Sequence, residues 1–306
     1  MSQMENPIAD LSYRNYDGPK SVSGARWWPI ARNGIRLTMR KKGFWVLVAL
    51  AWFPYLMLIL QLFFSTMTEQ TRMNRMIDLP KYAESLAAAF GQWPMVLFIA
   101  LLCGAGAIAA DNRSNALQIY LAKSISKNDY LIGKWLSIFL TLFAVVFLPM
   151  FLITLYAAFS LGFSDFIKTD GLLFVKIPFV AAIPAFVHAS VLCGVSAWNK
   201  SPMIAGLIYS GIFFAWNIFS QVMGLVLEDR LSPVARQTLD YLSLQGSISG
   251  LGQTILGVAP RALTDARFDH PPLPYWPPLL LLAVLFCVFG ILIARARIRA
   301  VEVVQG

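Results

Sequence analysis

The chain offers few residues that could do chemistry, and they are scattered. Asp265, Asp269 and His270 come close together in a polar segment. They could bind a metal ion, but their spacing follows no firm rule of metal sites, and solvated loop charge explains them better. The sequence has no Gly-x-x-x-x-Gly-Lys-Ser/Thr phosphate loop, no His-Glu-x-x-His and no Gly-x-Ser-x-Gly. We therefore expect that this chain is not an enzyme and carries no metal or cofactor of its own.

The long apolar stretches of the chain lack the groups that drive ion-coupled transport. No Asp, Glu, Lys or Arg lies within the body of any such stretch, and His188 is the only imidazole there. Proton- and ion-driven carriers usually need an ionisable relay at membrane depth. A lone His in a helix bundle is more often a hydrogen-bonded packing residue. If the protein moves a molecule uphill, the energy therefore comes from outside these stretches.

Asn217 and Gln221 are the best candidates for a transport pathway. They lie four residues apart, on one face of an apolar helix. Hydrogen bonding between helices is an equally good explanation of this pair. Small residues four apart, at Gly106/Ala110 and at Gly206/Ser210, indicate close contacts between helices or between two copies.

The composition indicates which elements hold these residues. Of the 306 residues, 58% are apolar and only 13% are charged, against roughly 25% charged in soluble domains. A membrane-spanning helix needs roughly 20 apolar residues. The sequence therefore predicts an all-α integral membrane protein with a membrane domain over residues 43–294. Its six transmembrane helices are expected at Gly43–Ser65, Trp93–Ala110, Trp135–Phe163, Leu172–Trp198, Met203–Leu227 and Pro277–Ala294.

The net charge of +9 and the cysteines give little support to other classes of protein. The basic residues flank apolar stretches, which points to membrane topology and anionic lipid, and no nucleic-acid module is visible. We therefore expect no nucleic-acid partner. The three cysteines, Cys103, Cys193 and Cys287, lie inside apolar stretches and predict no disulfide framework.

The distribution of Lys and Arg predicts the orientation. With six spans, both termini share one side, and sixteen of the 25 Lys and Arg residues fall there against eight on the other side. Cytoplasmic segments carry the excess of basic residues. We therefore expect a multi-pass protein of the cell inner membrane with both termini in the cytoplasm, including the tail at 295–306.

A basic amphipathic helix is predicted over residues 26–42, after a flexible tail at 1–25. Apolar side chains recur there at helical spacing beside a basic stripe, a pattern typical of helices that lie in the membrane interface. The alternative, a simple basic flank that orients the first span, is compatible with this interpretation. The residues expected at the membrane interface are Trp27, Trp28, Arg32, Arg36 and Arg40, with Ala31, Ile35 and Met39 on the apolar side.

The segment between spans two and three, residues 111–134, is the predicted coupling segment. Leu117, Tyr120 and Leu121 form an apolar patch on a short helix. Ser126 to Asp129 has the form of a capping box that begins the third helix, in which Ser126 accepts a hydrogen bond from the amide of Asp129. A short helix held against the membrane could dock a cytoplasmic partner. The alternative is a loop that only reverses the chain.

A long segment over residues 228–276 is predicted on the outer side. Its middle, Leu239–Val258, mixes Leu and Ile with Ser and Gly and is too polar for a seventh span. It could form a re-entrant or interfacial helix pair, or an ordinary surface loop with one amphipathic helix. Tyr275 and Trp276 fit an interfacial aromatic belt.

The segment from Ala110 to Trp135 resembles the corresponding segment of ABC-2 type transporter permeases. In that family an acidic residue is followed by a Gly-Thr-Leu-like turn, by Leu-x-x-Pro-Ile-Ser-Arg, and by an apolar residue with Gly-Lys. Here Asp111 takes the acidic position and Asn115-Ala116-Leu117 replaces the turn. Ser124-Ile125-Ser126-Lys127 replaces Pro-Ile-Ser-Arg, and Gly133-Lys134 matches. The layout of the whole chain is also similar.

The resemblance implies a membrane-spanning permease subunit of an ATP-driven transporter, most simply an exporter. It implies a second permease copy and a separate cytoplasmic ATP-binding cassette subunit, which would hold ATP and Mg. An integral membrane enzyme acting on lipid and a non-transporting scaffold or assembly factor are the alternatives. The residues expected to contact the ATP-binding subunit are Asp111, Arg113, Leu117, Tyr120, Leu121 and Lys123.

Overall fold

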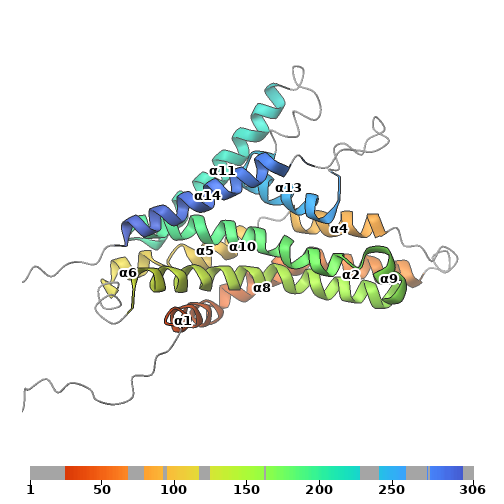
Figure 1. The fold of residues 1–306 in the computed structure, drawn as a ribbon, viewed down its shortest axis with the longest axis horizontal. Coiled ribbons are helices and arrows are strands. Elements are labelled where there is room, and N and C mark those ends of the chain that lie inside the picture. The colour runs from red at the N-terminus through yellow and green to blue at the C-terminus, as the bar shows by residue number, and fades with distance from the viewer. Residues whose placement is uncertain are drawn as a thin grey trace, which may run out of the picture.

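A computed structural model shows a bundle of long helices (Figure 1). It describes residues 25–67, 79–91, 95–116, 125–161, 163–227, 241–259, 274 and 276–298, and these contain helices but no strand. The helices are α1 (Trp28–Met39), α2 (Lys42–Met67), α4 (Leu79–Gly91), α5 (Met95–Gly104), α6 (Ala109–Arg113), α8 (Lys127–Leu161), α9 (Phe163–Asp170), α10 (Leu173–Trp198), α11 (Pro202–Val226), α13 (Leu244–Leu256) and α14 (Trp276–Arg297).

Six helical segments among the described residues are long and apolar enough to cross a membrane, which confirms the predicted fold class. They are Lys42–Phe64, Met95–Arg113, Lys127–Ser160, Leu173–Trp198, Pro202–Val226 and Trp276–Arg297. The third span begins eight residues before the predicted Trp135. Its polar first two turns extend the helix beyond the apolar stretch, because the capping box at Ser126 begins the helix there.

The most deeply buried span is α10, which packs along both α8 and α14. Its backbone touches that of α14 at two glycines. A methyl group on Gly194 would lie 2.5 Å from the carbonyl oxygen of Gly290. Without a strong hydrophobic driving force between helices in lipid, such close packing of small residues is a principal source of association.

A proline in α8 leaves a backbone carbonyl that α2 satisfies. Pro149 has no N–H, so the carbonyl of Val145 lacks its helical partner. The indole N–H of Trp52 donates to that oxygen at 3.0 Å. This bond matters because an unpaired backbone group within the bilayer costs several kcal/mol.

Five aromatic rings stack along one face of α8. Successive ring centroids lie 5.0 to 5.8 Å apart, with interplanar angles from 8° to 26°. The i, i+4 spacing places each ring over the next on a helix. The stack passes Pro149, so it continues along α8 on both sides of the proline. Its members are Trp135, Phe139, Phe143, Phe147 and Phe151.

The bundle has two ends, which we name the α6 end and the α9 end after the short helices at each (Figure 1). At the α9 end, the Tyr82 hydroxyl of α4 shares a hydrogen bond of 2.7 Å with Thr154 of α8. Burial raises the pKa of the Tyr82 phenol above its ordinary value, and the Thr154 bond opposes that shift in part. The phenol therefore stays neutral and fastens α4 to the bundle.

The predicted outer segment contains α13, which packs against α4, α10 and α14. Ser243 caps its first turn by accepting from the amide of Gly246, and Gly257 ends it with φ of +76°. A methyl group on Gly252 would lie 2.6 Å from the ring of Phe90, so α4 approaches closely. The described part of Leu239–Val258 thus holds one helix rather than a helix pair, and this helix is packed into the bundle rather than carried on an exposed loop, so it matches neither interpretation fully.

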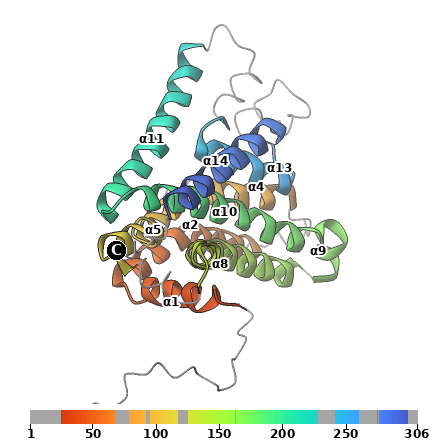
Figure 2. The same cartoon turned by 60° about the vertical axis from the view of Figure 1, so that its left-hand side comes forward.

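The fifth span, α11, diverges from the bundle. It starts beside the other helices at the α6 end, and its far end stands away from them in both views (Figures 1 and 2). Its inner side buries Ala205, Tyr209 and Phe213. Tyr209 shares a hydrogen bond of 2.5 Å with His188 of α10, in agreement with a packing role for this histidine.

Candidate functional site

The second span is interrupted where it reaches the α6 end, and the Ser196 hydroxyl of α10 hydrogen-bonds to the backbone at the interruption. The helix α5 ends at Gly104 and α6 begins at Ala109. The Ser196 hydroxyl accepts the N–H groups of Ile108 and Ala109 at 3.0 and 2.9 Å. It also donates to the carbonyl of Ala105 at 2.9 Å. A fully buried side chain thus supplies partners for backbone groups that the break would orphan.

Asn112 holds the same short helix to the end of α10. Its side-chain amide donates to the carbonyls of Ala197 and Asn199, at 3.2 and 3.3 Å. These carbonyls lie at the C-terminus of α10, where the helix leaves acceptors unsatisfied. The start of the predicted coupling segment is therefore fixed in position by the fourth span.

Asp111 ties α6 to the third span through charge. Its Oδ2 lies 2.7 Å from Nζ of Lys134 and accepts a hydrogen bond of 2.6 Å from the Tyr130 hydroxyl. The ammonium of Lys134 also lies 5.6 Å from the centre of the Tyr130 ring. Both charged side chains are mostly buried, at 17% and 15% exposure. Opposite charge and a donor compensate the desolvation of the carboxylate.

Asn115 ends α6 in a left-handed conformation, with φ of +54°. Glycine adopts this conformation without strain, and Asn is among the few other residues that do so routinely. Asn115 takes the position where the related permeases usually have Gly. The replacement therefore keeps the turn.

The capping box at the start of α8 forms as predicted. The Ser126 hydroxyl oxygen accepts from the amide of Asp129 at 3.1 Å. The Asp129 carboxylate accepts from the amide and the hydroxyl of Ser126, at 3.2 and 2.7 Å. The segment between α6 and α8 is thus held at both of its ends.

The first helix, α1, crosses α8 steeply (Figures 1 and 2). Gly133 allows this crossing, because a methyl group there would lie 2.7 Å from Cβ of Ile30 and 2.8 Å from the carbonyl oxygen of Trp27. Gly34 of α1 lies equally close to Ser137. The two residues of the Gly133-Lys134 motif therefore make different contacts. Gly133 allows the close approach of α1, and Lys134 forms the ion pair with Asp111. We call the contacts among α1, α6, α8 and α10 the junction.

The structure places some of the predicted coupling residues and not others. Asp111 faces inward to α8, and Arg113 is exposed at the end of α6. The apolar patch and its second flanking charge lie outside the described residues, and their role stays a prediction. These residues are Leu117, Tyr120, Leu121 and Lys123.

The predicted residues of the interfacial helix and of the pathway are placed as follows. Trp27 is half-buried and packs edge-on against the exposed Trp28, and all three predicted arginines of α1 are exposed. Gln221 donates to Asn217 at 2.6 Å within α11, where Gln221 is exposed and Asn217 is partly buried. Among the described residues these two amides therefore bind each other and no other helix.

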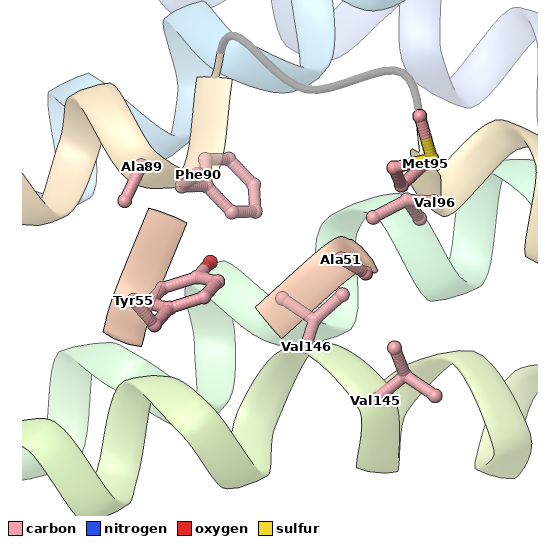
Figure 3. Close-up of a pocket in the computed structure, with 8 residues that line it drawn as sticks. All are labelled: Ala51, Tyr55, Ala89, Phe90, Met95, Val96, Val145 and Val146. Atoms are coloured by element: carbon pink, nitrogen blue, oxygen red, sulfur yellow. The ribbon is translucent and has the colours of Figure 1, made fainter. Parts of the chain in front are cut away.

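A small cavity lies between α2, α4, α5 and α8 (Figure 3). It measures about 20 Å³, which is room for one water molecule. Of the residues that line it, Tyr55 alone carries a hydroxyl, and Ala51, Phe90 and Val146 represent the apolar remainder. The cavity does not hold a cargo-sized molecule. In the described part of the chain, no three His, Cys, Asp or Glu residues could hold a metal ion, and Asp265, Asp269 and His270 lie outside that part.

Sequence reasoning missed Ser196, Asn112 and Tyr130 as parts of the junction. Asn112 and Tyr130 stand within the segment that carries the family resemblance, next to residues that were singled out. Ser196 is a lone hydroxyl near the end of an apolar span, a weak signal that many packing residues share. Its partners lie more than 80 positions away in the chain.

Six apolar helices and a polar junction at one end define a multi-pass helical membrane protein. Residues 28–296 match the family described as ABC-2 family transporter protein. The match covers nearly the whole chain, and the chain belongs to that family. It is therefore an ABC transporter permease. No curated protein matches it.

Proposed function

We propose that this permease is the membrane subunit of an exporter driven by a separate ATP-binding cassette subunit. The observation that carries the proposal is the junction, which fixes the start of the coupling segment to spans three and four through Asp111, Asn112 and Ser196. A partner that pushed on this segment would move those spans together. Permeases of this family generally work with an ATP-binding subunit and in dimers.

The orientation supports the same arrangement. The α6 end carries Arg113, Lys127, Lys200 and Arg295, together with the basic helix α1. This excess of basic residues supports a cytoplasmic location of the α6 end in an inner membrane. Both chain ends then lie in the cytoplasm, and α13 lies on the outer side. ATP and Mg bind the partner subunit, because the sequence contains no phosphate-binding loop.

The docking surface consists of the coupling segment beyond α6. Leu117, Tyr120 and Leu121 supply the apolar contact, and Arg113 and Lys123 flank it. Interface energy concentrates in a few apolar or aromatic anchors, while charges at the rim contribute less. Asp111 positions this surface from within through its contact with Lys134.

The diverging helix α11 supplies the contact with a second permease copy. Its outward side is apolar and exposed, as Leu207 and Phe219 illustrate, except for the Asn217–Gln221 pair. The hydrogen bond between the two amides satisfies only one donor and one acceptor, and a second helix or a passing cargo would provide partners for the remaining ones. This makes Asn217 and Gln221 the residues of choice for tests of the pathway.

The proposed function is tested by co-purification of the permease with its ATP-binding subunit. Leu121→Asp should abolish co-purification and Tyr120→Ala should weaken binding by about 2 kcal/mol, whereas Lys123→Ala should cost well under about 1 kcal/mol. Membrane abundance of each variant controls for insertion. The permease alone should not hydrolyse ATP. Full partner binding by both Leu121→Asp and Tyr120→Ala, or ATP turnover by the pure permease, would refute the proposal.

A further inference from the structure

The exposed side of α1 carries three arginines in a row. Arg32, Arg36 and Arg40 recur every four residues, so they lie along one side of the helix. All three are exposed, and within the described part of the chain none forms an ion pair with an acidic side chain. The helix itself has no acidic residue. Within the described residues, this side therefore presents three positive charges without an acidic partner.

An apolar strip lies beside the arginines and continues onto the surface of the first span. Trp28 and Met39 of α1 are each 44% exposed, and Trp45 at the start of α2 is 53% exposed. The Trp45 indole donates to the carbonyl of Met39 at 2.9 Å, which joins the two surfaces. Because the exposed apolar side of α2 faces lipid, the apolar strip of α1 lies where the hydrocarbon begins. The arginines then lie at the level of the lipid head groups.

We propose that this side of α1 binds the phosphate groups of anionic lipids through Arg32, Arg36 and Arg40. Guanidinium groups pair with phosphate through two parallel hydrogen bonds and hold this geometry better than ammonium groups do. The charge and the depth of the helix together favour a lipid over a protein partner. The inference rests on the proposed function only in placing α1 at the cytoplasmic leaflet, where anionic lipids are found.

The opposite side of α1 connects a bound lipid to the junction. Ile30 packs on Gly133 of α8, and Gly34 packs on Ser137. Gly133 directly precedes Lys134, the lysine that pairs with Asp111. The Lys41 ammonium, just after α1, donates to the carbonyl of Leu102 at the end of α5 at 2.9 Å. Anionic lipid under α1 thus stabilises the position of α8 and α5 at the end where the coupling segment emerges.

The test is a titration of the purified full-length permease with phosphatidylglycerol in mixed micelles, with phosphatidylcholine as the neutral comparison. Wild type should bind phosphatidylglycerol in preference. Each basic residue near an anionic surface strengthens binding about fivefold, so the variant R32Q/R36Q/R40Q should bind roughly a hundredfold more weakly. A variant with the same loss of charge at the same end, R113Q/K127Q/R295Q, should lose less than about tenfold in affinity, because these residues lie outside the row of arginines on α1.

Two further variants keep the test decisive if the triple Gln variant does not fold. Arg36→Gln alone should weaken binding about fivefold. The charge-preserving R32K/R36K/R40K should lie between wild type and the Gln variant, because lysine keeps the charge but loses the paired geometry. Binding of all Arg variants within twofold of wild type would overturn the proposal, as would equal losses in the control triple variant.

The same variants separate a lipid site from a protein site. If R32Q/R36Q/R40Q binds phosphatidylglycerol normally but no longer co-purifies with the ATP-binding subunit, α1 contacts protein and the proposal is wrong. The lipid titration needs no ATP-binding subunit. If the proposed function is wrong, the lipid titration can still be interpreted. If lipid binding fails, the proposed function is not affected.

Discussion

The ion pair of Asp111 and Lys134 serves to fix the position of α6 rather than to add much net stability. Both side chains are mostly removed from water. Their mutual attraction has to offset that desolvation, so an intact pair of this kind contributes little, whereas a single remaining charge is strongly unfavourable. The Tyr130 hydroxyl bonds the same carboxylate oxygen and fixes its direction.

Removal of the lysine is the residue-scale prediction. Lys134→Met leaves the Asp111 carboxylate with only the Tyr130 donor, and should lower the free energy of unfolding by about 2 kcal/mol. The exchanged pair D111K/K134D should recover about half of that loss, because it restores opposite charges in an altered geometry. Thermal unfolding of the purified variants measures both effects. The control is Lys127→Met, at an exposed position, which should leave the free energy of unfolding unchanged. Equal stability of Lys134→Met and wild type would contradict a positioning role.

The sequence predicted the residues of the site that depend on local order. The capping box of Ser126 and Asp129 joins residues three positions apart, so its pattern is visible in the chain itself. Asp111 was predicted as a contact for a partner, and its pairing with Lys134 was not foreseen. That pairing and the bonds of Ser196 depend on which spans become neighbours, and one sequence gives no measure of this.

For whole helices too, the sequence predicted features set within one helix and not the contacts between helices. Apolar length predicted the six spans, because the hydrocarbon core sets that length directly. Small-residue spacing pointed to Gly206, whose added methyl would be 3.6 Å from Ala105, an ordinary contact. The tightest helix contact instead joins Gly194 to Gly290. Ser190/Gly194 and Gly290/Ala294 have the same spacing of four, so the pattern was present in the sequence, but spacing alone does not show which pair of helices will meet.

A pair of glycine substitutions tests that contact. Gly194→Ala should lower the free energy of unfolding by about 2 kcal/mol, because its methyl meets the backbone of Gly290, which cannot rotate aside. Gly211→Ala is the matched control. It adds the same methyl to a span with nothing within 4 Å, and should be neutral or stabilising by about 0.5 kcal/mol. Unfolding in detergent measures both, and a similar loss in the two variants would mean that helix propensity, rather than packing, governs the result.

On the scale of the whole molecule, five spans form one bundle and α11 leaves it. The bundle is joined at the α6 end by the junction and at the α9 end by α4 and α13. Its third span runs through both ends. Over the 34 residues Lys127–Ser160, α8 extends roughly 50 Å at 1.5 Å per residue. The hydrocarbon core is roughly 30 Å thick, so α8 is long enough to reach water on both sides of the membrane.

Single cysteines on either side of α8 test this arrangement and its orientation. Ser114 precedes the helix and Ser164 follows it, and both are exposed. The native Cys193 and Cys287 are buried and should react weakly with a charged maleimide, whereas Cys103 is partly exposed. Both variants therefore also carry Cys103→Ala, and Cys103→Ala alone is the control. In intact cells, Ser164→Cys should be labelled by a membrane-impermeant reagent and Ser114→Cys should be labelled only after permeabilisation, because the excess of Lys and Arg predicts that the α6 end is cytoplasmic. The reverse pattern would invert the orientation and move the coupling segment out of reach of a cytoplasmic ATPase. Labelling of both positions from one side would mean that α8 does not cross the membrane, and the arrangement of six spans would be wrong.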